Sequence, residues 1–190
     1  VPEGTVVEGG ETVVAERWQN GKLINSYKSL WEAYNASGGK GTDTVKIVCD
    51  FVAKNSLPIG NWRDVAIDLC GHTIYVDSEV TYNGASYELF NFAYNENVNF
   101  VLTSSEGRGK IVSTANAAKP IFNCSTYKAE TPNNLNISNI DIVNGSNNIV
   151  FTGVKNGTIK LTDVTIDSTY STDKAARILY ADTAVKDGIV

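Results

Sequence analysis

The chain has 190 residues, enough for one domain with a sizeable core, and its formal net charge is −5. Nucleic acids and anionic membrane surfaces attract basic proteins, so the acidic balance excludes both as partners. No apolar run reaches the roughly twenty residues of a membrane-spanning helix, and the three cysteines lack zinc or disulfide-framework spacing. We expect no metal, no cofactor and no membrane insertion. We also expect a mature product or an excised domain, because the chain contains no Met and opens without a signal peptide.

The N-terminal part combines a hairpin with a short helix. The dipeptide Asn20-Gly21 lies between two strand-like runs and favours a type I′ turn, which predicts a hairpin over 11–28. Ser29 and Glu32 have the spacing of a capping box, and the apolar residues after Ser29 share one helical face. We therefore predict a helix over 30–36.

From residue 43 onward the sequence contains short strands only, and three segments share one spacing. In each segment, four interior residues are separated by steps of two, three and two. A step of two keeps side chains on one face of a strand, and a step of three adds one residue at a corner. The corners hold Cys70-Gly71, Ser138-Asn139 and Thr162-Asp163, and Gly, Asn and Asp accept a left-handed backbone. The interior residues are Ile67, Leu69, His72 and Ile74; Leu135, Ile137, Ile140 and Ile142; and Ile159, Leu161, Val164 and Ile166.

A third kind of strand recurs along the same part of the chain. Its four copies are "LFNF", "IFNC", "IVFT" and "ILYA". Two strands, a third strand and a return to the first make one coil of a β-solenoid, whose coils pair in parallel. We predict an all-β fold with about five coils over 43–190, which we expect to continue in the parent protein. Residues 1–42 are interpreted as an N-terminal cap, because a solenoid end is an exposed sheet edge.

The third strands offer two alternative apolar columns. One must fill the interior, so we expect the other to face outward beneath a cover, because soluble proteins rarely expose such a patch. The cover is expected to be the N-terminal hairpin, the long loops or a neighbouring domain, with a second copy of the chain as the alternative. The two columns are Phe90, Phe122, Val150 and Leu179, and Leu89, Ile121, Ile149 and Ile178.

The stretches "SYKSLWEAYNASGGKGTDTVKIVCDF" and "VAIDLCGHTIYV" resemble the start of β-helix domains in large secreted or wall-anchored bacterial surface proteins. The resemblance covers about residues 27–76 and centres on an L-D-L-x-G-H-T-I motif. It implies a right-handed parallel β-helix of the kind shared with pectate lyases, an extracellular or cell-wall location, and neighbouring domains in a larger chain. Cys70 stands where the family usually has Asn.

The candidate catalytic residues are interpreted as structural. His72 is the only histidine and shares its column with aliphatic residues, which indicates a packed ring rather than a general base. The coil register is expected to place Asp68 in line with Val101, Asn136 and Lys160, so that no outward column holds the two acids that glycoside cleavage requires. We therefore expect no catalytic site.

Aromatic residues in or beside the loops give the better functional hypothesis. Exposed rings beside polar side chains are typical of carbohydrate-binding faces, although the same rings can simply pack loops onto the solenoid. We predict a non-catalytic extracellular surface module for adhesion, for binding a glycan or host-surface ligand, or for spacing. The alternative is a polysaccharide-degrading enzyme or phage-tail depolymerase on the same scaffold. The candidate ligand-binding residues are Trp62, Tyr75, Tyr82, Tyr87, Tyr94 and Tyr127.

Overall fold

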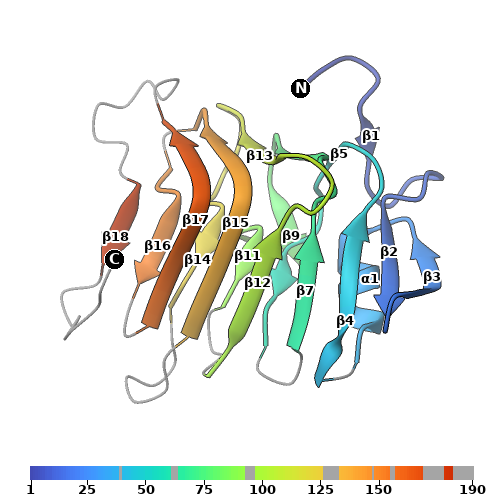
Figure 1. Cartoon of the computed structure of the whole chain (residues 1–190). Helices are drawn as coiled ribbons and strands as arrows, with labels where there is room; N and C mark the ends of the chain where they lie inside the picture. Colours follow the sequence, from blue (N-terminus) through green and yellow to red (C-terminus); the bar gives the residue numbers. More distant parts are fainter. Residues whose placement is uncertain are drawn as a thin grey trace.

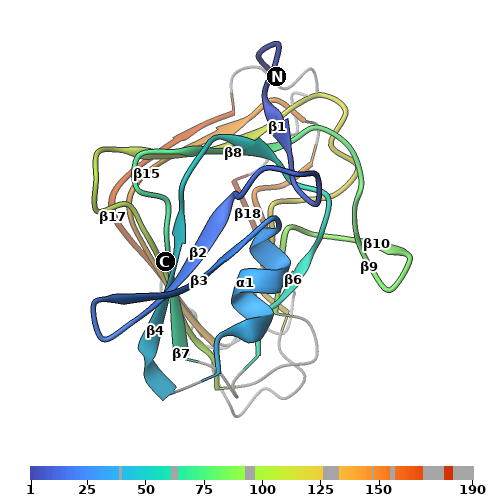
Figure 2. The same cartoon turned by 90° about the vertical axis from the view of Figure 1, so that its right-hand side faces the viewer.

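Strands make up most of the computed structural model, and the part of the chain it describes contains one helix, so the protein is all-β as predicted (Figure 1). Most strands lie in parallel rows, with an antiparallel hairpin added at the N-terminal end (Figure 2). The structure describes residues 1–38, 40–60, 64–92, 97–125, 133–146, 148–154, 157–168 and 178–181.

Parallel pairing arranges the strands in three rows, and the first two rows belong to one 11-stranded sheet. The first row contains β4 (Lys40–Ile47), β7 (Asp64–Asp68), β12 (Asn99–Thr103), β15 (Asn133–Asn144) and β17 (Gly157–Asp167). The second row contains β5 (Phe51–Val52), β8 (Thr73–Val76), β13 (Gly109–Ser113) and the C-terminal halves of β15 and β17. The third row contains β6 (Leu57–Pro58), β11 (Phe90–Asn91), β14 (Phe122–Asn123), β16 (Phe151–Val154) and β18 (Leu179–Ala181).

The chain visits these rows in turn, which places residues far apart in sequence side by side. Each visit to the three rows is called a pass. The first pass contains β4, β5 and β6, the second contains β7, β8 and β11, and the third contains β12, β13 and β14. The long strands β15 and β17 each cross the corner between the first two rows at a residue with positive φ, Asn139 (57°) and Asp163 (53°). These are residue types that tolerate a left-handed backbone, as the sequence predicts for the corners.

The predicted register is confirmed between the last two cornered pairs. For the earlier pair it is confirmed after the corner, where Ile74 aligns through Ile111 with Ile142, and is wrong before the corner. Leu135 pairs with Ile159, and the remaining interior positions of β15 and β17 follow in step. Ile67, however, aligns through Leu102 with Ile137 rather than with Leu135. Ile67 aligns with Ile137 before the corner and Ile74 aligns with Ile142 after it, so the corner that contains Cys70 and Gly71 is two residues longer than the corner of β15.

The third row departs from the predicted columns: of the expected outward column, Leu89 and Ile121 are buried, whereas Ile178 is exposed. Phe122 pairs with Phe151, which moves "IVFT" by one position from the predicted alignment. Residues before each strand, such as Leu89 and Val150, lie at bends in the backbone, so two consecutive side chains reach the same buried cluster. Polar side chains such as Asn91 occupy the alternate position on the strand.

The N-terminal hairpin and helix form where predicted and cover the start of the rows (Figure 2). Strand β2 (Ala15–Gln19) pairs antiparallel with β4 and with β3 (Lys22–Tyr27), which makes the large sheet mixed. The first strand, β1 (Val6–Val7), extends the second row by pairing with β5. Helix α1 (Leu30–Ala36) buries Leu30, Ala33 and Tyr34. The N-terminal strands therefore occupy the outer edges of β4 and β5.

Candidate functional site

An antiparallel hairpin projects from the rows on the side of α1 (Figure 2). The most complete candidate site is a pocket of about 310 Å³ that residues of this hairpin and of α1 line. The hairpin consists of β9 (Val80–Tyr82) and β10 (Ala85–Tyr87). We call this site the aromatic pocket. Its lining residues are Trp31, Asn55, Thr81, Tyr82, Asn83 and Gly84.

The hairpin is built by its turn and fixed by one loop. Asn83 (φ 50°) and Gly84 (φ 78°) both have positive φ, as a two-residue type I′ turn requires. The Thr81 N–H donates to the carbonyl oxygen of Lys54 at 2.9 Å, and the Ser56 N–H donates to the carbonyl of Thr81 at 3.0 Å. The hairpin therefore stands in a fixed position next to the segment that carries Asn55.

The opposite wall comes from the helix. Ser29 caps α1 by accepting a hydrogen bond from the Glu32 N–H at 3.3 Å, which fixes where the helix begins. The buried face of α1 excludes Trp31, whose side chain is half-buried and lines the pocket. Across the pocket, the ring of Tyr82 is held edge-on by Tyr87, with 6.4 Å between ring centroids.

The chemistry of the aromatic pocket suits an uncharged polar ligand. Of the described residues that line it, two carry aromatic rings, two carry amides, two carry hydroxyls and none carries a charge. Aromatic faces pack against the C–H groups of a sugar ring, and amides and hydroxyls exchange hydrogen bonds with sugar hydroxyls. The combination is typical of a carbohydrate site.

The predicted aromatic residues fall into three groups. Tyr82 lines the aromatic pocket, and Tyr87 supports it from behind. Tyr75 lies on β8 between Val52 and Val112 and does not line the pocket. The other three candidates, Trp62, Tyr94 and Tyr127, lie outside the described residues.

Trp31 is a pocket residue that the sequence interpretation missed. The signal was present, because a Trp within the predicted helix lies off the face formed by Leu30, Ala33 and Tyr34. A large ring that the helix does not need for its own packing is a candidate for ligand contact.

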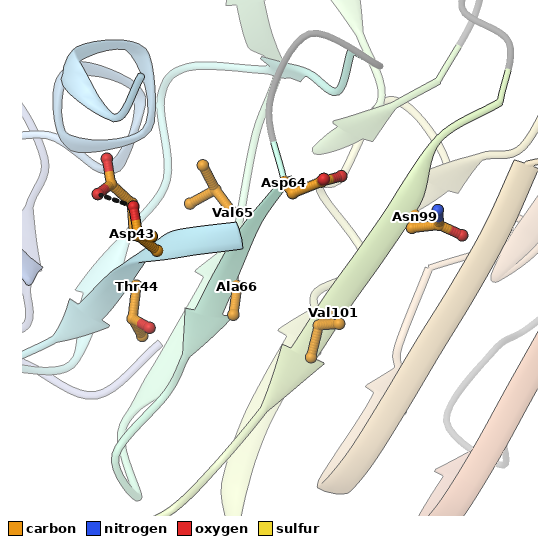
Figure 3. Close-up of a pocket in the computed structure, with 8 residues that line it drawn as sticks. Asp43, Thr44, Asp64, Val65, Ala66, Asn99 and Val101 are labelled. Carbon is orange, nitrogen blue, oxygen red and sulfur yellow. Dashed lines mark hydrogen bonds between the residues drawn. The ribbon is translucent and has the colours of Figure 1, made fainter. Parts of the chain in front are cut away.

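A second groove, of about 340 Å³, crosses the outer face of the first row (Figure 3). Thr44, Ala66 and Val101 are register partners and form its floor, and Asp64 and Asn99 stand at its rim (Figure 3). The small side chains leave the space open. Its described lining residues include polar groups but no aromatic ring, so among these residues it offers no stacking surface like that of the aromatic pocket.

The second acid in this groove, Asp43, is committed to the fold. Its carboxylate is fully buried and accepts hydrogen bonds from Arg17 Nε at 3.0 Å and Gln19 Nε2 at 2.9 Å. The Gly38 N–H also donates to it, at 3.0 Å. Burial raises the pKa of Asp43, but the hydrogen bonds from Gly38, Gln19 and Arg17 outweigh burial and lower the pKa below its ordinary value. Asp43 therefore stays ionised as a structural anchor.

His72 lines a third pocket, of about 270 Å³, and the prediction of an interior ring is wrong. Its side chain is 36% exposed, and Nδ1 lies 3.3 Å from Oδ1 of Asp50. The physical reason is the long corner, which directs the fully buried Leu69 into the interior. The next pass has Gly109 at this level, and a Cβ there would lie 2.7 Å from the Cβ of Leu69. Leu69 occupies the space that the sequence assigned to His72.

Cys70 also lines this pocket but is not an activated nucleophile. Burial, followed by the nearby Asp68 carboxylate, raises the pKa of the thiol to about 11, so the thiolate that attack requires is scarce near neutral pH. Asp68 itself accepts from the Cys70 N–H at 3.0 Å and from Ser105 through its N–H at 2.9 Å and its hydroxyl at 2.5 Å. These bonds identify Asp68 as the residue that holds the corner.

The register of Asp68 also corrects the expected alignment. It pairs with Lys46 and Thr103, two residues along the row from the predicted partners Val101, Asn136 and Lys160. The shift follows from the longer corner at Cys70. Asp141, by contrast, aligns through Lys110 with Thr73 as expected.

Metal-ligand groups, membrane-spanning helices and similarity to known proteins do not identify a further site. Within the described ranges, no group of three or more His, Cys, Asp or Glu is placed to hold a metal ion. In the same part of the chain, no helix has the length and apolar character to cross a membrane. Comparison with protein-family models, with curated proteins and with solved structures yields no match.

Proposed function

We propose that the chain is a right-handed parallel β-helix from an extracellular surface protein, and that it binds carbohydrate. Support for the β-helix comes from the three parallel rows visited in turn and from the matching register of β15 and β17. The resemblance of about residues 27–76 to bacterial surface β-helices supports both the handedness and the extracellular or cell-wall location.

The ligand we propose is a neutral glycan, bound in the aromatic pocket. The observation that carries the proposal is the joint placement of Trp31 and Tyr82 around a cavity that Asn55 and Asn83 also line, with no charged group among the described lining residues. A negatively charged sugar would meet no cation among the described lining residues, and the chain as a whole is acidic. Both facts favour uncharged sugars.

One observation favours the alternative, a polysaccharide-cleaving enzyme. Glu16 and Glu106 both line the pocket of His72, and glycoside cleavage uses two carboxylates. Each already has a partner, since Glu16 accepts from Trp18 Nε1 at 2.9 Å and Glu106 lies 3.7 Å from Lys46 Nζ. The binding module is therefore the preferred function.

A glycan array tests the proposal with the purified wild-type chain and the variants Trp31→Ala and Tyr82→Ala. We expect neutral glycans to bind the wild type and to lose most of their binding in both variants, because each removes a stacking face. Tyr75→Ala is the matched control, since it removes a half-buried tyrosine that does not line the pocket. Binding that survives both pocket substitutions would contradict the proposal.

The same proteins should be incubated with the polysaccharides that bind. Release of new reducing ends by the wild type, lost in Glu106→Gln, would establish the alternative. Binding without cleavage supports the surface module.

A further inference from the structure

We propose that Glu8 is a positioning residue of the aromatic pocket, whose carboxylate ties the helix that carries Trp31 to the loop that carries Asn55. The inference rests on the proposed function only where its test measures the affinity for a glycan. Glu8 lies outside the pocket lining and acts through the backbone of both walls.

The two carboxylate oxygens of Glu8 bond to different walls. Oε2 accepts from the Leu30 N–H at 3.1 Å, and Leu30 is the first residue of α1, directly before Trp31. Oε1 accepts from the Lys54 N–H at 2.5 Å and from the Asn55 N–H at 2.6 Å. One side chain thus spans the two segments whose separation sets the width of the pocket.

The position of Glu8 is itself fixed by the strand before it. Val6 pairs with Phe51 and Val7 with Val52, so β1 adds to the edge of β5. The Glu8 N–H then donates to the carbonyl oxygen of Val52 at 3.1 Å, and the Gly9 N–H donates to the carbonyl oxygen of Lys28 at 2.7 Å. The N-terminal strand therefore delivers the carboxylate to its partners from a rigid base.

The burial of Glu8 makes these bonds consequential. Only 5% of the residue is exposed, and a buried carboxylate is costly unless several donors satisfy it. Burial raises the pKa of Glu8, although the backbone N–H groups of Lys54, Asn55 and Leu30 act in the opposite direction. These N–H groups belong to a helix start and a loop, where a backbone partner is often missing. Removing the carboxylate would leave both walls without their shared anchor.

The test uses the full chain with Trp31 as its single tryptophan, obtained with Trp18→Phe and Trp62→Phe. In this background, Glu8→Gln keeps an oxygen for the loop but turns an amide N–H toward the Leu30 N–H, which breaks the bond to the helix. We expect acrylamide to quench Trp31 fluorescence more strongly in Glu8→Gln than in its parent. We also expect the affinity for a neutral glycan to fall about tenfold, equivalent to about 1.4 kcal/mol.

Two controls separate positioning from a general loss of stability. Glu11→Gln removes an exposed acid that bonds only to Lys28, and it should change neither quenching nor affinity. A second reporter background, with Trp18 as the single tryptophan, should show no change in quenching with Glu8→Gln. Unchanged Trp31 quenching in a variant with native circular dichroism would overturn the proposal.

The outcome remains decisive if Glu8→Gln does not fold or if no glycan binds. Glu8→Asp then replaces it, because the shorter side chain keeps the charge but does not reach both walls, and the same quenching comparison applies. If the wild type binds no neutral glycan, the proposed function fails, while the quenching of Trp31 still decides the role of Glu8.

Discussion

Phe122 is the residue on which the stacked interior depends most directly. Its fully buried ring is stacked between Phe90 and Phe151, with centroids 5.0 and 4.8 Å away and planes tilted by 17° and 20°. Each aromatic pair contributes about 0.5–1.5 kcal/mol beyond the burial of area. Phe122→Leu keeps most of the apolar volume but loses both pairs, so we expect the free energy of unfolding to fall by about 1–3 kcal/mol from stacking alone.

The matched control is Phe92→Leu, because Phe92 is equally buried but, among the described rings, contacts that of Phe100 alone, at 5.4 Å. It loses one pair, so its expected loss from the same source is about 0.5–1.5 kcal/mol. Urea unfolding followed by circular dichroism measures both variants. A loss in Phe122→Leu no larger than that in Phe92→Leu would refute the reasoning that stacking between passes stabilises the fold.

Three further predictions concern the corner and the cap. The lowered pKa of Asp68 means that its bonds stabilise the fold above the ordinary carboxyl pKa and are lost as pH falls through the lowered value. Asp68→Asn should therefore cost about 1–3 kcal/mol near neutral pH and progressively less in acid, as urea midpoints will show; a pH-independent cost would contradict this. Gly71→Ala should lower the melting temperature, because φ is 81° and the new Cβ would clash with the Glu106 carbonyl. Deleting 1–36 should cause aggregation in light scattering, because it exposes the edge of β4; a truncated chain that stays monomeric would exclude a capping role.

The repeat could be predicted where successive passes have corners of equal length. β15 and β17 satisfy this condition, so Leu135 and Ile159 were aligned correctly from their spacing alone. The corner at Cys70 is longer, and spacing alone does not reveal which of Leu69 and His72 turns inward. In the structure it is Leu69 that turns inward, against the backbone of Gly109 in the next pass, where a Cβ would lie 2.7 Å from the Cβ of Leu69.

The third row shows a different limit of sequence reasoning. Strict alternation assigns Leu89 and Phe90 to opposite faces of a strand, whereas a bend at Leu89 directs both to the interior. The bend depends on how the chain enters a two-residue strand, which periodicity does not record. The hairpin and helix near the N-terminus were predictable, because turn and capping signals are local.

The candidate site was predictable only in part. Tyr82 is predictable because it is an aromatic residue in a loop-like segment. Trp31 and Asn55 join it through contacts between the helix and a loop of the first pass, and Glu8 joins those elements across 46 positions of sequence. Such long-range convergence leaves no local pattern.

The most direct test of carbohydrate binding in the aromatic pocket is an NMR titration of the indole N–H resonances with a neutral oligosaccharide selected by the array. The chain has three tryptophans, and single Trp→Phe substitutions assign their resonances. The account predicts a saturable shift of the Trp31 resonance, absent in Tyr82→Ala. Saturable binding that leaves the Trp31 resonance unmoved would contradict it.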